Sequence, residues 1–241
     1  MTSKSPYITS NALIRYCVAK APERHRIIEE FRSSDFPPFK GWYGGETEGA
    51  VRRYIASGGA DDAALADLEV LLQKRPVDSN FEEARLIKQF EALQGARETP
   101  LKQIVTAGTV SLLEDKLGPF MVEGVRVSVR PTNVVTANRS GYKLPFIGVV
   151  KPYFSSTDPL TAETADLYGA LLHWYAEVQF ADVTQADPAL CFVLDVFQRR
   201  AFRAPRAYKQ RRDLIAFSCR EIYERWTAPA AARSARGIKA R

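Results

Sequence analysis

The chain has 241 residues, 46% of them hydrophobic and 26% charged, so it is large enough to bury a sizeable core. No run approaches about 18 apolar residues and the N-terminus has no long apolar segment. These features argue against a membrane span and a signal peptide. The formal net charge of +6 mildly favours an anionic partner.

Three cysteines, Cys17, Cys191 and Cys219, lie far apart in the sequence and form no CxxC motif or Cys/His cluster. A zinc site is therefore not expected. Each cysteine has apolar neighbours and is predicted to be a small core residue. An odd and sparse set of cysteines is typical of a reducing compartment, so we expect a cytoplasmic location.

After a polar segment at residues 1–10 that is expected to fray, the chain is predicted to be all-helical to about residue 95. Apolar residues recur there at the three- and four-residue spacing of amphipathic helices. The predicted helices cover 11–19, a segment from Pro22, 46–56, a segment from the cap Asp61-Asp62 to Pro76, and a segment from the cap Asn80 to Leu93. An aromatic connector at 36–45 either packs on the core or offers a binding surface.

The segment from Pro119 to Ser155 is predicted to hold a β-hairpin. Val125, Val127 and Val129 alternate with polar residues, which is the period of a half-buried strand. Turn-forming residues follow at 138–141, and a second apolar run at 146–150 ends at Lys151. We therefore expect residues 124–151 to form one antiparallel hairpin.

The remaining chain is predicted to cover and extend this hairpin. A strong apolar stripe indicates a helix from about Pro159 to Phe180. A buried strand is expected at 189–197 and a closing helix at 206–226. The predicted organisation is a helical region at 1–99, an α/β core at 100–228 and a basic disordered tail at 229–241.

This order of elements resembles the PD-(D/E)XK nuclease-like superfamily over about residues 100–226. The resemblance implies a central mixed β-sheet flanked by helices. It also implies an Asp early in the hairpin and an acidic-x-Lys triplet on the next strand, which together hold Mg²⁺ and activate water. Here these motifs correspond to Arg130-Pro131-Thr132 and to Val149-Val150-Lys151.

Two of the three diagnostic residues are absent, because neither Thr132 nor Val149 carries a carboxylate. Lys151 is then the remnant of a catalytic lysine, and no metal or other cofactor is expected. If Mg²⁺ does bind, the candidate replacement ligands are Glu114, Glu123 and Asp195. The alternatives are solvated surface positions for the two glutamates and a structural carboxylate for Asp195.

Basic residues concentrate between Arg199 and Arg212, at a predicted strand-to-helix junction. Such a cluster binds phosphates in a nucleic-acid-binding protein and is a solvated face in others. The candidate nucleic-acid-binding residues are Arg130, Lys151, Arg206, Lys209, Arg211 and Arg212. The two histidines, His25 and His173, are expected at the surface and at the edge of the core.

The sequence therefore predicts a non-catalytic nucleic-acid-binding or regulatory protein on a degenerate nuclease-like fold, with DNA or RNA as partner. One alternative is an active metal-dependent nuclease with relocated carboxylates. The other is a protein–protein interaction module that binds its partner through the helical N-terminal region. No membrane partner is expected.

Overall fold

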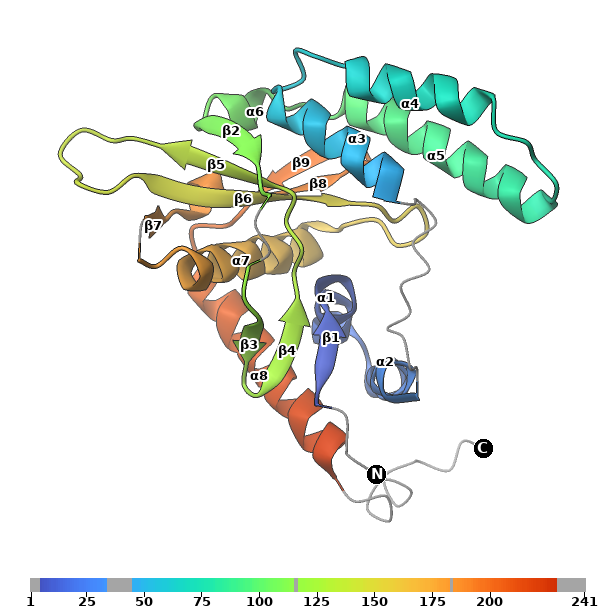
Figure 1. The fold of residues 1–241 in the computed structure, drawn as a ribbon. Coiled ribbons are helices and arrows are strands. Elements are labelled where there is room, and N and C mark those ends of the chain that lie inside the picture. Colours follow the sequence, from blue (N-terminus) through green and yellow to red (C-terminus); the bar gives the residue numbers. More distant parts are fainter. Residues whose placement is uncertain (1–4, 34–44, 115–116, 183, 229–241) are drawn as a thin grey trace.

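The structure is a computed structural model that describes residues 5–33, 45–114, 117–182 and 184–228. Within this part of the chain it is an α/β protein, with N-terminal helices and two β-sheets flanked by helices (Figure 1). The predicted tail at 229–241 and the predicted connector up to residue 44 lie outside the described residues. None of the helices described here is long and apolar enough to cross a membrane.

In the part of the chain that the structure describes, a short strand and six helices come first, five consecutive strands follow, and the last part of the chain mixes helices with short strands. The helices are α1 (Ser10–Val18), α2 (Ala21–Ser33), α3 (Gly45–Ala56), α4 (Ala63–Gln73), α5 (Asn80–Glu98), α6 (Lys102–Val105), α7 (Ala162–Gln179), the 3₁₀ helix η1 (Pro188–Leu190) and α8 (Tyr208–Thr227). The strands are β1 (Tyr7–Thr9), β2 (Thr109–Leu112), β3 (Phe120–Val122), β4 (Val125–Ser128), β5 (Asn133–Ala137), β6 (Phe146–Tyr153), β7 (Gln185–Ala186), β8 (Phe192–Asp195) and β9 (Arg200–Arg203).

The larger sheet is mixed and has the order β2-β5-β6-β8-β9, with β7 beside β6. Strands β2, β5 and β6 are antiparallel, whereas β8 runs parallel to β6 after the crossover through α7. Helices α3 to α6 lie on one face, and α7 lies on the other with α8 and α1 beyond it (Figure 1). The sheet is thus the middle layer of the molecule.

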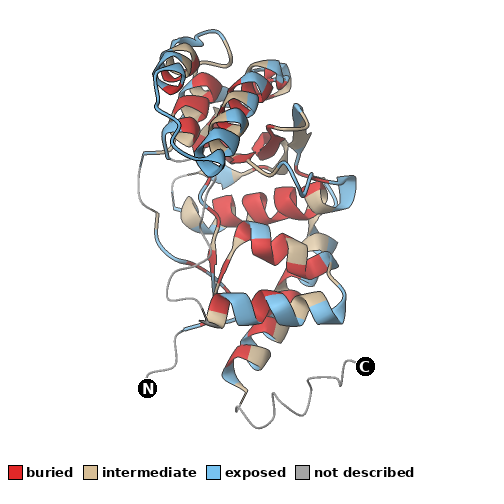
Figure 2. Cartoon of the chain, turned by 90° about the vertical axis from the view of Figure 1, so that its right-hand side faces the viewer, coloured by how far each residue is buried: buried red, intermediate tan, exposed pale blue. Residues whose placement is uncertain are grey.

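Burial on both faces explains the continuous apolar runs of the central strands. Val149 of β6 packs in the core on the α7 side, and the next residue, Val150, packs in the core on the α3 side. A strand covered on both faces needs apolar residues at every position. Figure 2 shows that several outer helices bury one face and expose the other, whereas a central helix is buried along most of its length.

The smaller sheet has three strands in the order β1-β4-β3. A two-residue turn at Glu123 and Gly124 joins β3 to β4, and both residues have positive φ, 47° and 76°, as a type I′ hairpin turn requires. Strand β1 pairs with β4 in parallel and buries Ile8. The prediction that residues 1–10 fray and that the N-terminal region is all-helical is therefore wrong at Tyr7–Thr9, because the partner strand of β1 lies far along the chain.

The predicted single hairpin at 124–151 is also wrong in its first strand. Residues 125–128 alternate as expected but belong to the smaller sheet, and the hairpin of the larger sheet pairs β5 with β6. The chain changes sheets at Arg130 and Pro131. Arg130 takes a positive φ of 51°, and Pro131 has no N–H to donate to a ladder. Strand-like residues lie on both sides of this break, so the sequence pattern does not show where the chain passes from one sheet to the other.

The long helix predicted after the hairpin is confirmed as α7. Thr161 caps it, accepting a hydrogen bond from the N–H of Thr164, whose hydroxyl in turn accepts from the N–H of Thr161. The helix packs on β6 and β8. The predicted strand at 189–197 is shorter than expected, because its first residues form η1 before β8 begins.

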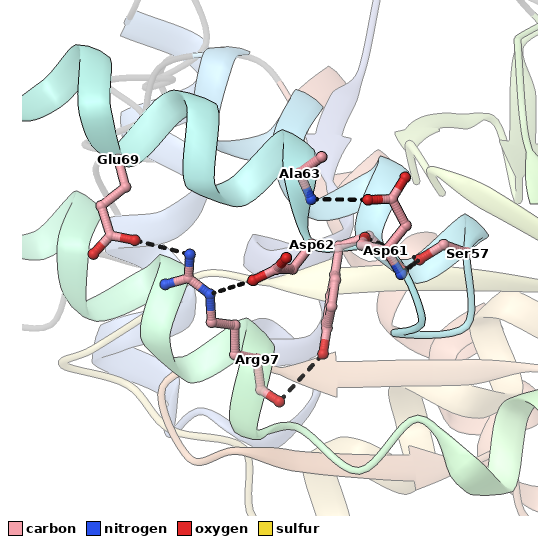
Figure 3. A network of polar contacts seen from close by, with 7 residues as sticks. Ser57, Asp61, Asp62, Ala63, Glu69 and Arg97 are labelled. Atoms are coloured by element: carbon pink, nitrogen blue, oxygen red, sulfur yellow. Dashed lines mark hydrogen bonds and ion pairs between the residues drawn. The ribbon is translucent and has the colours of Figure 1, made fainter.

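Helices α3, α4 and α5 form the layer on the outer side of the larger sheet. Arg97 of α5 joins all three: its guanidinium contacts Glu69 at 2.8 Å and Asp62 at 3.5 Å, and its carbonyl accepts from the hydroxyl of Tyr54 at 3.3 Å (Figure 3). The predicted cap at Asp61-Asp62 acts through Asp61, which accepts from the N–H of Ala63. These contacts tie the start of α4 to the end of α5.

The cap predicted at Asn80 is wrong by one residue. Ser79 is the N-cap of α5 and accepts a hydrogen bond from the N–H of Glu82. The carboxylate of Glu82 in turn accepts a hydrogen bond from the N–H of Asp78. Because Ser and Asn are both favourable caps, the sequence alone did not separate them.

The three cysteines are free and buried, as predicted for core residues. Cys17 and Cys219 lie between α1 and α8, and Cys191 lies between η1 and β8. Burial raises the pKa of the Cys17 thiol to about 11 and that of Cys191 to about 12. Since the thiolate is the reactive form, these thiols are inert at neutral pH.

Candidate nucleic-acid interface

The predicted remnant Lys151 lies near the end of β6, where it is partly buried. Its ammonium group donates a hydrogen bond to the carbonyl of Arg130 at 3.3 Å. Burial lowers the pKa of Lys151 to about 8, and the guanidinium of Arg130 acts in the same direction. The carboxylate of Glu48, on α3, opposes this shift. Two of the predicted binding residues, Arg130 and Lys151, are thus neighbours.

The positions that would hold carboxylates in a nuclease are filled by groups that cannot bind a metal strongly. Val149 is fully buried in the core. Thr132 is buried and donates its hydroxyl hydrogen to the side chain of Asn133 at 2.8 Å. Asn133 is also buried, and its amide donates to the carbonyl of Arg52 on α3 at 2.9 Å. This polar cluster fastens α3 to the start of β5.

We expect the Lys151→Met variant to be more stable than the wild type at pH 7 by about 1 to 2 kcal/mol, after allowance for the partial exposure of the side chain. The lowered pKa means that the unfolded chain binds this proton more strongly between pH 8 and 10.5. The charged Lys151 therefore lowers the free energy of unfolding by its full amount below pH 8, and this destabilisation disappears as the pH rises to 10.5. Urea unfolding across this range measures the difference.

The matched control is Lys143→Met, because Lys143 is an exposed lysine in the β5–β6 loop. Its difference from the wild type is expected to stay within about 0.5 kcal/mol at every pH. A Lys151→Met variant that is less stable than the wild type at pH 7 would mean that the contacts of the ammonium outweigh its burial.

The three candidate metal ligands do not converge. Glu114 is exposed after β2, and Glu123 lies in the β3–β4 turn, where it pairs with Arg220 of α8 at 3.4 Å. Asp195 is fully buried at the end of β8 and accepts hydrogen bonds from the N–H groups of Leu160 and Gln198 and from the side chain of Gln198. Across the residues with a defined position, no group of three or more His, Cys, Asp or Glu side chains is arranged to hold a metal.

The basic cluster at the β9–α8 junction divides into paired and exposed residues. Arg211 pairs with Asp166 of α7 at 2.9 Å, and Arg212 pairs with Glu177 of α7. By contrast, Arg206 and Lys209 are exposed, and neither side chain has a hydrogen bond or ion pair to another described residue. Of these four residues, Arg206 and Lys209 are the two whose charge is not paired with an acid of the described chain.

Arg212 also belongs to the packing between α7 and α8. Its guanidinium contacts Nδ1 of His173 at 2.8 Å and lies 4.6 Å from the ring centre of Tyr208. Burial and the charge of Arg212 lower the pKa of His173, although Glu177 opposes the shift. His173 is therefore a buried neutral side chain that holds two helices together, deeper in the core than predicted.

A pocket of about 300 Å³ lies between the β5–β6 loop, η1 and the β9–α8 connection. Three arginines from these segments line it, Arg139, Arg203 and Arg206, with one acid, Asp187. Asp187 pairs with the guanidinium of Arg139. The pocket therefore carries a positive charge in excess, and the exposed Arg206 connects it to the basic surface that includes Lys209.

The sequence did not predict the roles of two residues at these sites. Arg139 was expected only to form part of a turn, and Glu48 only to form part of a helix. Their roles depend on contacts between segments far apart in the chain, and no local pattern signals such contacts. Arg203 lies within the basic cluster but was not singled out.

Comparisons with known proteins give no match to a family model, to a curated protein or to a solved structure. The site therefore has to be interpreted from its own geometry and charge.

Proposed function

We propose that the protein binds DNA or RNA without cleaving it, through a basic surface formed by Arg206, Lys209 and the arginine-lined pocket. The observation that carries the proposal is that Arg139 of the β5–β6 loop lines one pocket with Arg203 and Arg206, which lie more than 60 residues later at the end of β9 and after it. Arginine binds phosphate through paired N–H groups, and each phosphate contact adds affinity that depends on salt. A formal net charge of +6 supports an anionic partner.

The arrangement of the larger sheet supports the resemblance of the core to the nuclease-like superfamily. The antiparallel pair β5–β6 is followed by the crossover helix α7 and the parallel strand β8, which corresponds to the hairpin, helix and further strand that the resemblance implies. Thr132 donates its N–H to the carbonyl of Val150, so the two motif positions are adjacent. Neither Thr132 nor Val149 supplies a carboxylate, so these two positions offer no acidic metal ligand.

We expect the double variant Arg206→Gln/Lys209→Gln to bind a labelled oligonucleotide at least about tenfold more weakly at low salt, because it loses two exposed charges. The slope of log K against log salt should become shallower by about 1 to 2. Fluorescence anisotropy at a series of salt concentrations measures both quantities. Since the two side chains are exposed and form no hydrogen bond or ion pair with another described residue, the fold should be unaffected.

The matched control is Lys20→Gln/Arg26→Gln, which removes the same charges from exposed positions next to or on α2. This variant should keep the affinity and the salt slope of the wild type to within about twofold. If the wild-type protein retains neither DNA nor RNA at low salt, the proposal is wrong.

A second candidate function, a protein–protein interaction module, is favoured by the outer helices. Large apolar side chains are exposed on α4 and α5, namely Val70, Leu71, Phe81 and Ile87. Exposed apolar groups that gather on a surface mark interaction sites in many soluble proteins. Binding of a protein at these helices should be insensitive to salt, which separates this function from nucleic-acid binding.

A further inference from the structure

We propose that the pocket lined by Arg139, Arg203 and Arg206 binds a phosphomonoester, the terminal phosphate of a nucleic-acid strand. The inference rests on the proposed function and specifies which part of the nucleic acid the pocket takes. It would give the protein a preference for phosphorylated ends over internal positions.

Charge is the first argument. Three guanidinium groups and one carboxylate line the pocket, which leaves two positive charges in excess. A phosphomonoester has a second pKa of about 6 and so carries close to two negative charges at neutral pH. An internal phosphodiester carries one. The pocket therefore matches the charge of a terminal phosphate.

Pre-organisation is the second argument. The guanidinium of Arg139 is held by Asp187 and lies 4.3 Å from the ring centre of Phe146. That of Arg203 lies 5.3 Å from the ring centre of Phe192. Stacked guanidinium groups lose little freedom when they bind a ligand, so more of the interaction energy appears as affinity.

The backbone around the pocket is fixed as well. Asp187 donates its N–H to Ile147 of β6, and Ala204 donates its N–H to Cys191, both at 2.9 Å. Asp187 also accepts from the N–H of Ala189 at 2.7 Å, which orders the first turn of η1. The segment that carries Arg203 and the segment that carries Asp187, the partner of Arg139, are thus hydrogen-bonded to the central strands.

Size is the third argument. Pockets for small ligands measure about 300 to 1,000 Å³, so a pocket of about 300 Å³ lies at the small end of this range. It accommodates one phosphate with part of its nucleotide and excludes a duplex. Arg206, exposed at the rim, is placed to contact the phosphate that enters.

The test compares one single-stranded oligonucleotide in three forms: with a 5′-phosphate, with a 3′-phosphate and with hydroxyl groups at both ends. Wild-type protein should bind at least one phosphorylated form about tenfold more tightly than the hydroxyl form, as expected for added charge-assisted hydrogen bonds. The Arg206→Gln variant should lose this preference. Lys209→Gln, which removes a charge outside the pocket lining, should weaken all forms alike and keep the preference.

Isothermal titration with a nucleoside 5′-monophosphate and with inorganic phosphate separates the possible sources of the ligand. Equal binding of all three oligonucleotides by the wild type would overturn the inference and leave the proposed function standing. Binding of the monophosphate, lost in Arg206→Gln, with no binding of any oligonucleotide would support a phosphomonoester pocket for free nucleotides and overturn the proposed function. Absence of binding to every ligand would overturn both.

Discussion

Replacing Asp195 with alanine should lower the free energy of unfolding by about 3 kcal/mol. The carboxylate is fully buried and accepts hydrogen bonds from the N–H groups of Leu160 and Gln198, at 2.9 and 3.0 Å. Alanine would leave both donors unpaired in the interior, and each unpaired buried donor costs about 1 to 3 kcal/mol. Urea unfolding at pH 7 measures the loss.

The matched control is Asp158→Ala, because Asp158 is an exposed aspartate in the β6–α7 loop, two residues before Leu160. Its effect should stay within about 0.5 kcal/mol. An Asp195→Ala variant with unchanged stability would contradict the structural role of this carboxylate and would reopen Asp195 as a metal ligand.

Replacing Gly148 with alanine should lower the free energy of unfolding by about 2 to 3 kcal/mol. A Cβ atom at this position would lie 2.3 Å from the backbone of Leu190, and backbone atoms in η1 cannot move aside as a flexible side chain can. Alanine is normally favoured over glycine in a strand by about 0.5 to 1 kcal/mol. Here the close approach outweighs this gain.

Gly49→Ala is the comparison that separates packing from backbone freedom. Gly49 lies within α3, and a Cβ there would meet no atom within 4 Å. We expect this variant to be more stable than the wild type by up to about 1 kcal/mol, because alanine has the higher helix propensity. Equal effects of the two substitutions would show that η1 does not pack against Gly148 as closely as the structure has it.

Local patterns in the sequence were sufficient to predict the helices and strands whose apolar residues recur with a clear period. The apolar stripe of α7 and the buried runs of β6 and β8 were predicted with their approximate bounds, because burial on one helix face or on both sheet faces leaves a repeating signature. The mixed sheet flanked by helices was expected from the resemblance to a nuclease-like core, and the structure shows a mixed sheet between helices.

Pairing between distant segments could not be predicted in the same way. Nothing near Ile8 indicates that it forms a strand beside Val127, and the alternation around Arg130 does not reveal that the chain moves from one sheet to the other. The site shows the same limit. Arg139 and Arg203 line one pocket because the β5–β6 hairpin and β9 both lie close to η1.

The alternative of an active nuclease depends on the groups around Lys151. The structure adds one carboxylate to this neighbourhood, Glu48 of α3, which acts electrostatically on the lysine. One carboxylate beside the buried Thr132 and Val149 falls short of the two or more anionic ligands that a productive Mg²⁺ site needs. Lys151 alone supplies charge to a phosphate and does not activate water.

The measurement that tests the central claim most directly follows binding and cleavage in the same sample. Purified protein is incubated with labelled linear DNA, circular DNA and RNA, with Mg²⁺ or Mn²⁺ and without metal, beside the Lys151→Ala variant. Native gels report the complex and denaturing gels report strand breaks. We predict a retarded complex at low salt and intact strands in every condition. Metal-dependent cleavage that disappears in Lys151→Ala would contradict the account and make this protein a nuclease with a rebuilt site.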